Sequence, residues 1–475
     1  MTDESSRHDE LIAASATSMV ARLRSGEITP HDCLDALERR IGAVDGAINA
    51  LPTLCFDRAH KHASELMKKP AGERGLLAGL PVPIKDLSRV AGVRTTFGSP
   101  IFADLVPDAS DITVEQIERE GGIIYAKSNT PEFGAGANTF NPVFGSTRNP
   151  WNLARSAAGS SGGAAAALAA GTAWVAHGSD MGGSLRNPAS FCGIVGMRPT
   201  PGCIATSNAT QIDQTLGVQG PMARNVEDLA LFYDAMAGEH RGDLLSKPRR
   251  AESYASAARN GWKPKRVAYS TGLGITPVDA QVAAVTRAAA DRLANDGVIV
   301  EEAHPDLSTA HECFHVLRAH AFAIGHGQLI AAHRDKYKPD LLWNIEEGLK
   351  LTQERVMRAQ WQRAALARNL DAFFGRYDLL LTPATITAAF PVEQTYLAEC
   401  DGHKFENYIL WLAIAYAITL CGAPAISIPC GFTDETMPVG LQIVAPTNCD
   451  ARAIAGAAYI EQLLGRGSTP IDPRK

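Results

Sequence analysis

The sequence predicts one large α/β domain over residues 1–475, in which helices cover both faces of a mixed, mostly parallel β-sheet. The first observation behind this is that short apolar runs typical of strands alternate with longer helical patterns along the chain. The second is the composition, 45% hydrophobic and 20% charged, with no Pro/Ser-rich linker, internal repeat or low-complexity run to divide it.

The N-terminal third contains the clearest helix boundaries. We expect a helix that ends at Gly26, followed by one that Thr29 caps and Pro30 opens and that runs to about Gly42. Strands and a third helix follow. The ranges expected in this part are helices over 16–25, 30–42 and 111–120 and strands over 81–84 and 123–126.

The remaining elements repeat the same alternation. Asn225 and Asp228 resemble a capping box for a helix that ends near Met236. Residues 408–421 form the longest apolar run, which is too short to span a bilayer and is typical of a buried or pocket-lining helix. The other expected elements are helices over 164–170 and 278–294, mostly helical structure over 308–374, and strands over 173–176, 266–269, 298–301, 377–381, 425–429 and 440–444.

Composition and charge bear on whole classes of function. The net charge is −6 and no lysine-arginine stripe is present, so we expect no nucleic-acid binding. The nine cysteines are scattered without a Cys-x-x-Cys pair, and the acidic N-terminus has no apolar signal-peptide core. We therefore expect a cytoplasmic protein with no membrane segment, no metal site and no organic cofactor.

Two glycine-serine segments carry the chemistry. In 178–188, paired glycines precede Ser184, and successive amides in such a turn form an anion site. The backbone N–H groups of Met181, Gly182, Gly183 and Ser184 are thus candidates for an oxyanion hole. The alternative is an ordinary tight turn between a strand and a helix.

The segment 159–163, Gly-Ser-Ser-Gly-Gly, opens the alanine-rich helix and has three interpretations. Ser160 can relay a proton for Ser184. Ser161 can be the nucleophile of a G-x-S-x-G elbow, as in an α/β-hydrolase esterase. A helix N-terminus can also bind phosphate, although no lysine follows at Walker-A spacing.

Lys85 follows the stiff, apolar run 79–84. Burial there would lower the pKa of its amine and leave it neutral, and therefore able to accept a proton. The alternative is a surface lysine paired with Asp86.

Together these segments resemble the amidase signature family of serine hydrolases. The resemblance runs from the N-terminal helices to about Pro446. Its segments are Lys85-Asp86 with 90–96, 129–133, 147–151, 159–163, 182–186, 187–193, 424–429 and 438–442.

The resemblance implies a Ser-cisSer-Lys triad. Ser184 would be the nucleophile that forms the acyl-enzyme, Ser160 the bridging serine after a cis peptide bond, and Lys85 the base. Supporting residues would be Asp180, Arg186, Gly159 and Ser161. Two positions depart from the common pattern, Ala158 before Gly159 and Met181 before the paired glycines, where the Met181 side chain would make the substrate pocket more apolar.

We therefore expect a hydrolase of C–N acyl bonds in a small-molecule amide, anilide or carbamate, with ester cleavage as a side activity. By the same resemblance, residues 1–65 form N-terminal helices, 75–230 the catalytic core and 305–420 a helical excursion at the substrate pocket. Trp411 and Tyr416 are its candidate pocket residues, with core packing as the alternative. The glutaminase subunit of a tRNA-dependent amidotransferase is an alternative function. A homodimer of the chain is one possible assembly.

Overall fold

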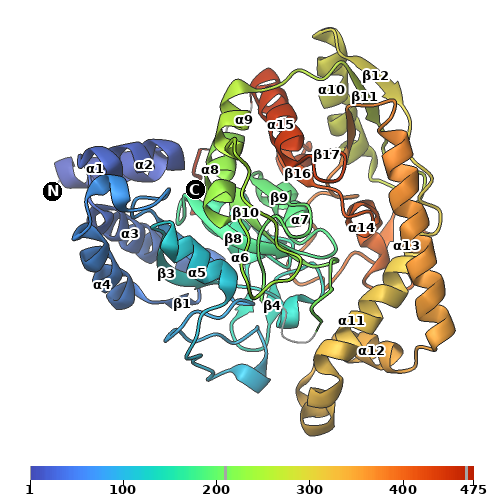
Figure 1. Cartoon of the computed structure of the whole chain (residues 1–475), viewed down its shortest axis with the longest axis horizontal. Coiled ribbons are helices and arrows are strands. Elements are labelled where there is room, and N and C mark those ends of the chain that lie inside the picture. Colours follow the sequence, from blue (N-terminus) through green and yellow to red (C-terminus); the bar gives the residue numbers. More distant parts are fainter. Residues whose placement is uncertain (1, 208–210, 466–468, 475) are drawn as a thin grey trace.

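The computed structural model describes residues 2–207, 211–465 and 469–474. Along its longest axis, the first helices lie at one end and α11–α13 at the other, with the large sheet between them (Figure 1). The α-helices are α1 (Thr2–Ala13), α2 (Ala16–Ser25), α3 (Pro30–Ile48), α4 (Phe56–Met67), α5 (Ile112–Arg119), α6 (Gly162–Ala169), α7 (Arg186–Cys192), α8 (Val226–Met236), α9 (Tyr254–Asn260), α10 (Ala280–Asn295), α11 (Ala310–His333), α12 (Pro339–Leu349), α13 (Gln353–Phe373), α14 (Ala413–Leu420) and α15 (Asp450–Leu464).

Eight strands form the large sheet, in the order β12-β11-β13-β17-β16-β9-β10-β8. They are β8 (Val175–Asp180), β9 (Val195–Arg198), β10 (Val218–Ala223), β11 (Arg266–Tyr269), β12 (Ile299–Glu302), β13 (Leu379–Pro383), β16 (Ala425–Phe432) and β17 (Pro438–Val444). The prediction of a mixed sheet is confirmed, but the prediction that most strand pairs are parallel is wrong. Only β11 pairs in parallel with its neighbours, and the other five adjacent pairs are antiparallel. The reason is that short connections such as the one between β16 and β17 reverse the chain, whereas parallel pairs need a long crossover.

A smaller sheet carries the lysine. Its strands are β1 (Thr53–Leu54), β2 (Pro81–Lys85) and β3 (Ile123–Ser128), in the order β1-β3-β2, and β2 packs against β8 of the large sheet. Pro81 and Pro83 have no N–H to donate, which suits them to the edge of a sheet. The edge strand of the smaller sheet, β2, thus lies against the edge strand of the large sheet, β8.

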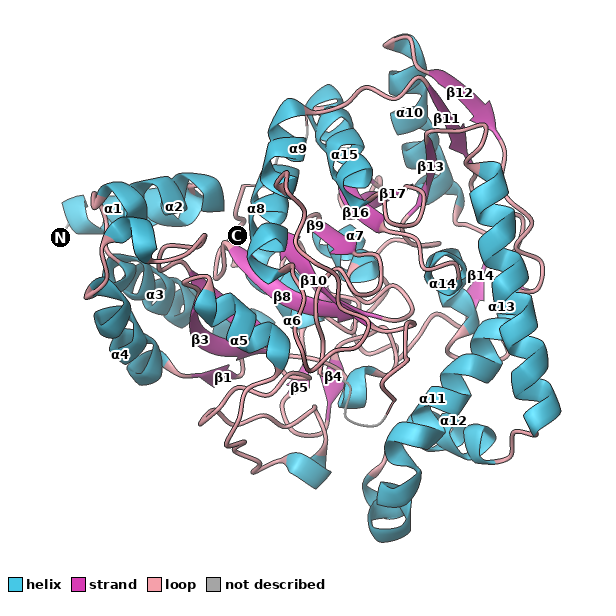
Figure 2. Ribbon diagram, in the orientation of Figure 1, coloured by secondary structure: helices cyan, strands magenta, loops and turns pink. Residues whose placement is uncertain are grey.

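Two groups of helices cover the large sheet, and the strands run between them (Figure 2). The helices α8, α10 and α15 pack on the sheet and on one another, while α6 and α7 pack together against the strands near the functional turns. Short elements complete the chain. They are the 3₁₀ turns 71–73, 100–102, 132–134, 334–336 and 410–412 and the two-residue strands of three small hairpins, 140–141 with 145–146, 399–400 with 403–404, and 148–149 with the longer 152–156.

Most expected elements are confirmed within a few residues, because their caps are present. The Thr29 hydroxyl accepts from the Asp32 N–H in a full capping box, and the Asn225 side chain accepts from the Asp228 N–H at the start of α8. Helix α3 continues past Gly42 to Asn49, which takes the left-handed conformation. Buried α14 and the 3₁₀ turn before it account for the apolar run 408–421. Among the described residues, we find no helix with the length and apolar character needed to cross a membrane.

Candidate active site

Lys85 lies at the end of β2, fully buried, with its amine among three serine hydroxyls. Its Nζ is 2.7 Å from Ser160 Oγ, 2.8 Å from Ser161 Oγ and 3.0 Å from Ser179 Oγ. Burial lowers the pKa of Lys85 from 10.5 to about 7, and the negative charge of Asp180 partly opposes this. Near neutral pH a large fraction of this amine is therefore uncharged.

The surface-lysine alternative for Lys85 is wrong, because another lysine takes its expected partner. Buried Lys127 forms an ion pair with Asp86 at 3.0 Å and also bonds to the Thr95 hydroxyl at 2.8 Å. Asp86 further accepts from the Thr96 backbone and hydroxyl. Lys127 thus neutralises the charge of Asp86, and the Lys85 amine contacts the serine hydroxyls instead.

Sequence reasoning missed two neighbours of Lys85, His177 and Ser179. The Lys85 backbone N–H donates to His177 Nδ1 at 3.3 Å, and burial, with the nearby Lys85, lowers the pKa of His177 to about 3. His177 is therefore neutral and adds no charge beside the amine. The signal that could have found both residues is strand alternation, since positions 177 and 179 share one face of β8.

The loop before α6 presents Ser160 to a cavity and keeps Ser161 in the interior. The Gly159–Ser160 peptide bond is cis, as the resemblance implied. Ser160 lines the cavity, whereas Ser161 is fully buried between Lys85 and Ser179. A buried Ser161 does not suit the esterase alternative, which needs an exposed nucleophile.

The amides at the start of α6 already have partners. The Ser161 N–H donates to the Ser184 carbonyl, Gly162 N–H to Thr139 Oγ1 and Gly163 N–H to the Asn129 carbonyl, each at 3.2 Å. A phosphate cradle would need these donors free. The phosphate-binding alternative therefore finds no support here.

Asp180 organises the turn that carries Ser184. Its carboxylate accepts from the Gly183 and Leu185 N–H groups at 3.0 and 3.1 Å, and Arg186 donates to both of its oxygens at 2.9 and 3.0 Å. Burial would raise the pKa of Asp180, but Arg186 and Arg198 hold it well below its usual range. The resulting ionised pair fixes the turn between β8 and α7.

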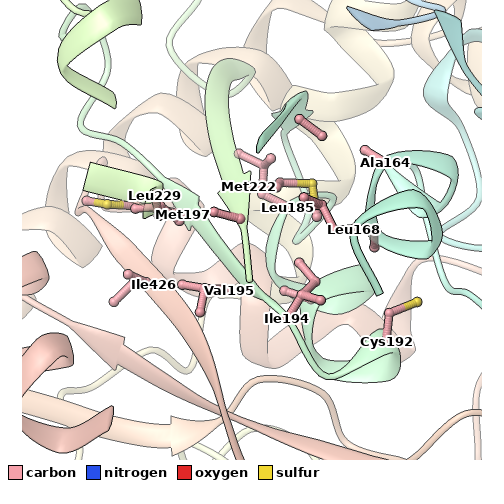
Figure 3. Packing of buried hydrophobic residues seen from close by; sticks show 14 of the residues in the cluster. Ala164, Leu168, Leu185, Cys192, Ile194, Val195, Met197, Met222, Leu229 and Ile426 are labelled. Atoms are coloured by element: carbon pink, nitrogen blue, oxygen red, sulfur yellow. The ribbon is translucent and has the colours of Figure 1, made fainter. Parts of the chain in front are cut away.

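Packing below the turn anchors the residue after Ser184. Leu185 is fully buried beside Met222 (Figure 3). Its side chain fills space left by Gly178 and Gly220 on the neighbouring strands, since a Cβ at either glycine would lie within 2.6 Å of it. These two glycines thus let Leu185 sink into the core and leave Ser184 at the surface of the cavity.

The structure separates the four amides that we expected to act as oxyanion donors. Met181, Gly182 and Ser184 line the cavity, but Gly183 does not, and its N–H donates to Asp180. Gly183 has φ +106°, and a Cβ there would lie 2.5 Å from Asn187 Oδ1, so glycine is required for the turn rather than for the anion site. The available donors are therefore the amides of 181, 182 and 184.

A cavity of about 220 Å³ joins Ser160 and Ser184. Its remaining wall is mixed. The apolar residues are Leu87, Phe133, Ala137, Met181, Val218, Phe314, Phe322 and Leu412, the polar or charged ones Ser179, Asp180, Thr206, Gln214, Gln219 and Arg318, and the glycines Gly134, Gly136, Gly182 and Gly217.

Of the three residues expected at the substrate pocket, one lines this cavity and two do not. Met181 contributes to it, but Trp411 and Tyr416 do not. Trp411 packs edge-on against Phe390 at 5.7 Å, and Tyr416 stacks at 4.3 Å behind the wall residue Phe314. Trp411 is buried against Phe390, on another side of the chain from its neighbour Leu412, which lines the cavity. Tyr416 lies one turn after Leu412, but the stacked Phe314 ring covers it and takes its place on the wall.

Among the described residues, no group of three or more His, Cys, Asp or Glu side chains is arranged to hold a metal ion. What the site combines is a buried amine of lowered pKa, hydroxyls next to it, and backbone donors around Ser184. These groups are suited to acyl transfer through a serine.

Comparison with known proteins agrees with this chemistry. Residues 32–454 match the amidase family. An acylamidase of Rhodococcus erythropolis is 36% identical over 451 residues, which are 94% of this chain and 94% of that protein. A glutamyl-tRNA(Gln) amidotransferase subunit of Halothermothrix orenii is 31% identical, over 93% of this chain and 95% of its own. The crystal structure of a bacterial aryl acylamidase of the amidase signature family superposes with a TM-score of 0.89 at 26% identity, covering 95% of this chain and 96% of the other.

Proposed function

The chain belongs to the amidase family of hydrolases that act on amide C–N bonds, and on that premise we propose that it cleaves its substrate through an acyl-enzyme on Ser184, with Ser160 as relay and Lys85 as base. The single observation that carries the assignment is the position of Lys85. Its buried amine has a pKa near 7 and lies 2.7 Å from the Ser160 hydroxyl, which faces the same cavity as Ser184.

The proposed first step is attack by Ser184 on the substrate carbonyl. The Ser184 proton passes to Ser160 as the Ser160 proton passes to the neutral Lys85 amine, so that no free alkoxide forms. The carbonyl oxygen becomes negative and accepts from the amides of Met181, Gly182 and Ser184.

The second half returns the proton and releases the enzyme. Protonated Lys85 sends its proton through Ser160 to the nitrogen of the leaving amine, and the C–N bond breaks. Water then gives a proton to the same relay and attacks the ester of Ser184. The relay returns that proton to Ser184 Oγ as the acyl–Oγ bond breaks, which frees the acid and restores the neutral Lys85 amine.

We infer that the substrate is a small amide, anilide or carbamate with an apolar or aryl group, and that esters are cleaved as a side activity. Phe314, Phe322 and Leu412 on the cavity wall support this, as do relatives named acylamidase and aryl acylamidase. The four substrate classes share the carbonyl chemistry, so the wall rather than the relay sets the preference.

The test is covalent labelling with a fluorophosphonate, followed by mapping of the modified peptide. We expect the label on Ser184, with loss of labelling in Ser184→Ala and a strong decrease in Lys85→Met. Circular dichroism and the unfolding midpoint of each variant control for folding. A label on Ser161, or no label on the folded wild-type protein, would overturn the assignment.

A second candidate is the glutaminase subunit of a tRNA-dependent amidotransferase, which the 31% identity to the Halothermothrix orenii protein favours. We rank it lower because the acylamidase of Rhodococcus erythropolis is more similar, at 36% identity, and because Met181 and three phenylalanines give part of the cavity wall an apolar surface. Turnover of an anilide by the isolated chain supports the stand-alone hydrolase, whereas glutamine hydrolysis without anilide turnover supports the glutaminase.

A further inference from the structure

Arg318 of α11 brings a positive charge to the wall of the cavity. The residue is only 6% exposed, and what it exposes contributes to the wall. Its guanidinium donates to Asn344 Oδ1 and lies 4.3 Å from the ring centre of Phe322 and 5.2 Å from that of Tyr408. Two rings and an amide thus hold the guanidinium in one place.

This charge has no direct ion pair among the residues that the structure describes. Within residues 2–207, 211–465 and 469–474, no carboxylate forms an ion pair with Arg318. The other charged group on the wall, Asp180, is already neutralised by Arg186. The cavity wall therefore holds one arginine without a direct carboxylate partner, among aromatic, aliphatic and neutral polar side chains.

A nearly buried cation is costly unless an anion accompanies it. Arginine has five N–H donors in a planar fork that matches a carboxylate, and Asn344 accepts from only one of its nitrogens. Tyr408 also interacts with the guanidinium through its hydroxyl, and the Phe322 ring restricts it without taking a donor. A carboxylate that enters the cavity can therefore use the N–H groups that Asn344 and Tyr408 leave free.

We propose that Arg318 binds a carboxylate of the substrate, at a distance from the scissile bond, so that the preferred substrates are amides or anilides with a second, anionic end. Arg318 is then a specificity-determining residue of the hydrolase. The inference rests on the proposed function, because it assumes that the scissile carbonyl sits at Ser184.

A matched pair of anilides tests the proposal. One substrate is the mono-4-nitroanilide of glutaric acid, and the other has a primary carboxamide in place of the free carboxylate. The two have nearly the same size, and release of 4-nitroaniline reports only cleavage of the anilide bond. We expect kcat/KM of the wild type to be about 10- to 100-fold higher for the carboxylate.

Three variants locate the cause of this preference. Arg318→Gln should bring the ratio of the two kcat/KM values to about one, and Arg318→Lys should keep part of it, since lysine retains the charge but not the fork. Arg368→Gln removes an exposed arginine of α13 outside the cavity and should leave the ratio unchanged. Because both substrates are measured on the same variant, a partly unfolded sample does not alter the ratio.

A binding measurement separates this proposal from the proposed function. The shift of the unfolding midpoint by 4-phenylbutyrate, compared with 4-phenylbutyramide, requires no turnover. A larger shift by the acid that disappears in Arg318→Gln supports the carboxylate site even if Ser184 is not the nucleophile. Equal shifts, or an unchanged substrate ratio in Arg318→Gln while Ser184 is still labelled, would overturn the role of Arg318 alone.

Discussion

Replacement of Lys85 by methionine is the sharpest test of the mechanism, because the side chain keeps its length and loses only the amine. At pH 7 an ordinary lysine of pKa 10.5 is neutral in about 1 molecule in 3,000, whereas an amine of pKa about 7 is neutral in about half. Burial thus raises the fraction of usable base about 1,000-fold, which is of the size that general-base catalysis contributes.

Two pH profiles follow from this pKa. Wild-type kcat/KM should fall about tenfold per unit below pH 7 and be flat above about pH 8, since only the neutral amine accepts a proton. Stability should change in the same direction. At Lys85 the unfolded chain binds one proton more than the folded chain between about pH 7 and 10.5, so this residue contributes a rise of about 1.4 kcal/mol per pH unit to the free energy of unfolding there.

The assay is release of 4-nitroaniline from an anilide between pH 5 and 10, with thermal unfolding over the same range, for wild type, Lys85→Met and the exposed control Lys404→Met. Lys85→Met should lose about 10³- to 10⁴-fold in kcat/KM. It should also lose the part of the stability change between pH 7 and 10 that the titration of Lys85 contributes. The reasoning is refuted if the variant keeps more than a tenth of the activity, or if wild-type activity continues to rise above pH 9.

Three further substitutions test other parts of the site. Ser161→Ala should lower the rate of fluorophosphonate labelling by no more than about tenfold, because Lys85 keeps two other hydroxyl partners; complete loss would restore Ser161 as the nucleophile. Asp180→Asn should lower the free energy of unfolding by about 3–5 kcal/mol, since it leaves buried guanidinium groups unpaired, and an unchanged denaturation midpoint would contradict the buried pair. Gly178→Ala should lower stability by about 1–3 kcal/mol and reduce labelling, because the new methyl group would lie 2.6 Å from Leu185; a fully active, equally stable variant would show that the turn does not depend on this packing.

Local chemistry explains why most elements were predictable. Thr29, Asn225 and the glycines after helices act through contacts within a few residues, so their effect is visible in the sequence. The direction of strand pairing is not local. It depends on which distant strands meet, and here that made most pairs of the large sheet antiparallel.

The sequence by itself determined the reactive groups of this protein. Lys85 after an apolar run, Ser160 and Ser184 among glycines, and the order of these segments are properties of the chain, and they carried the resemblance to the amidase family. The tertiary structure alone decided how each group is used. It buried Lys85 beside three hydroxyls, tied the Gly183 amide to Asp180, turned Tyr416 away behind Phe314, and brought Arg318 from the distant helix α11 to the cavity. Burial and charge compensation depend on neighbours far apart in the sequence, which is why no local pattern could reveal them.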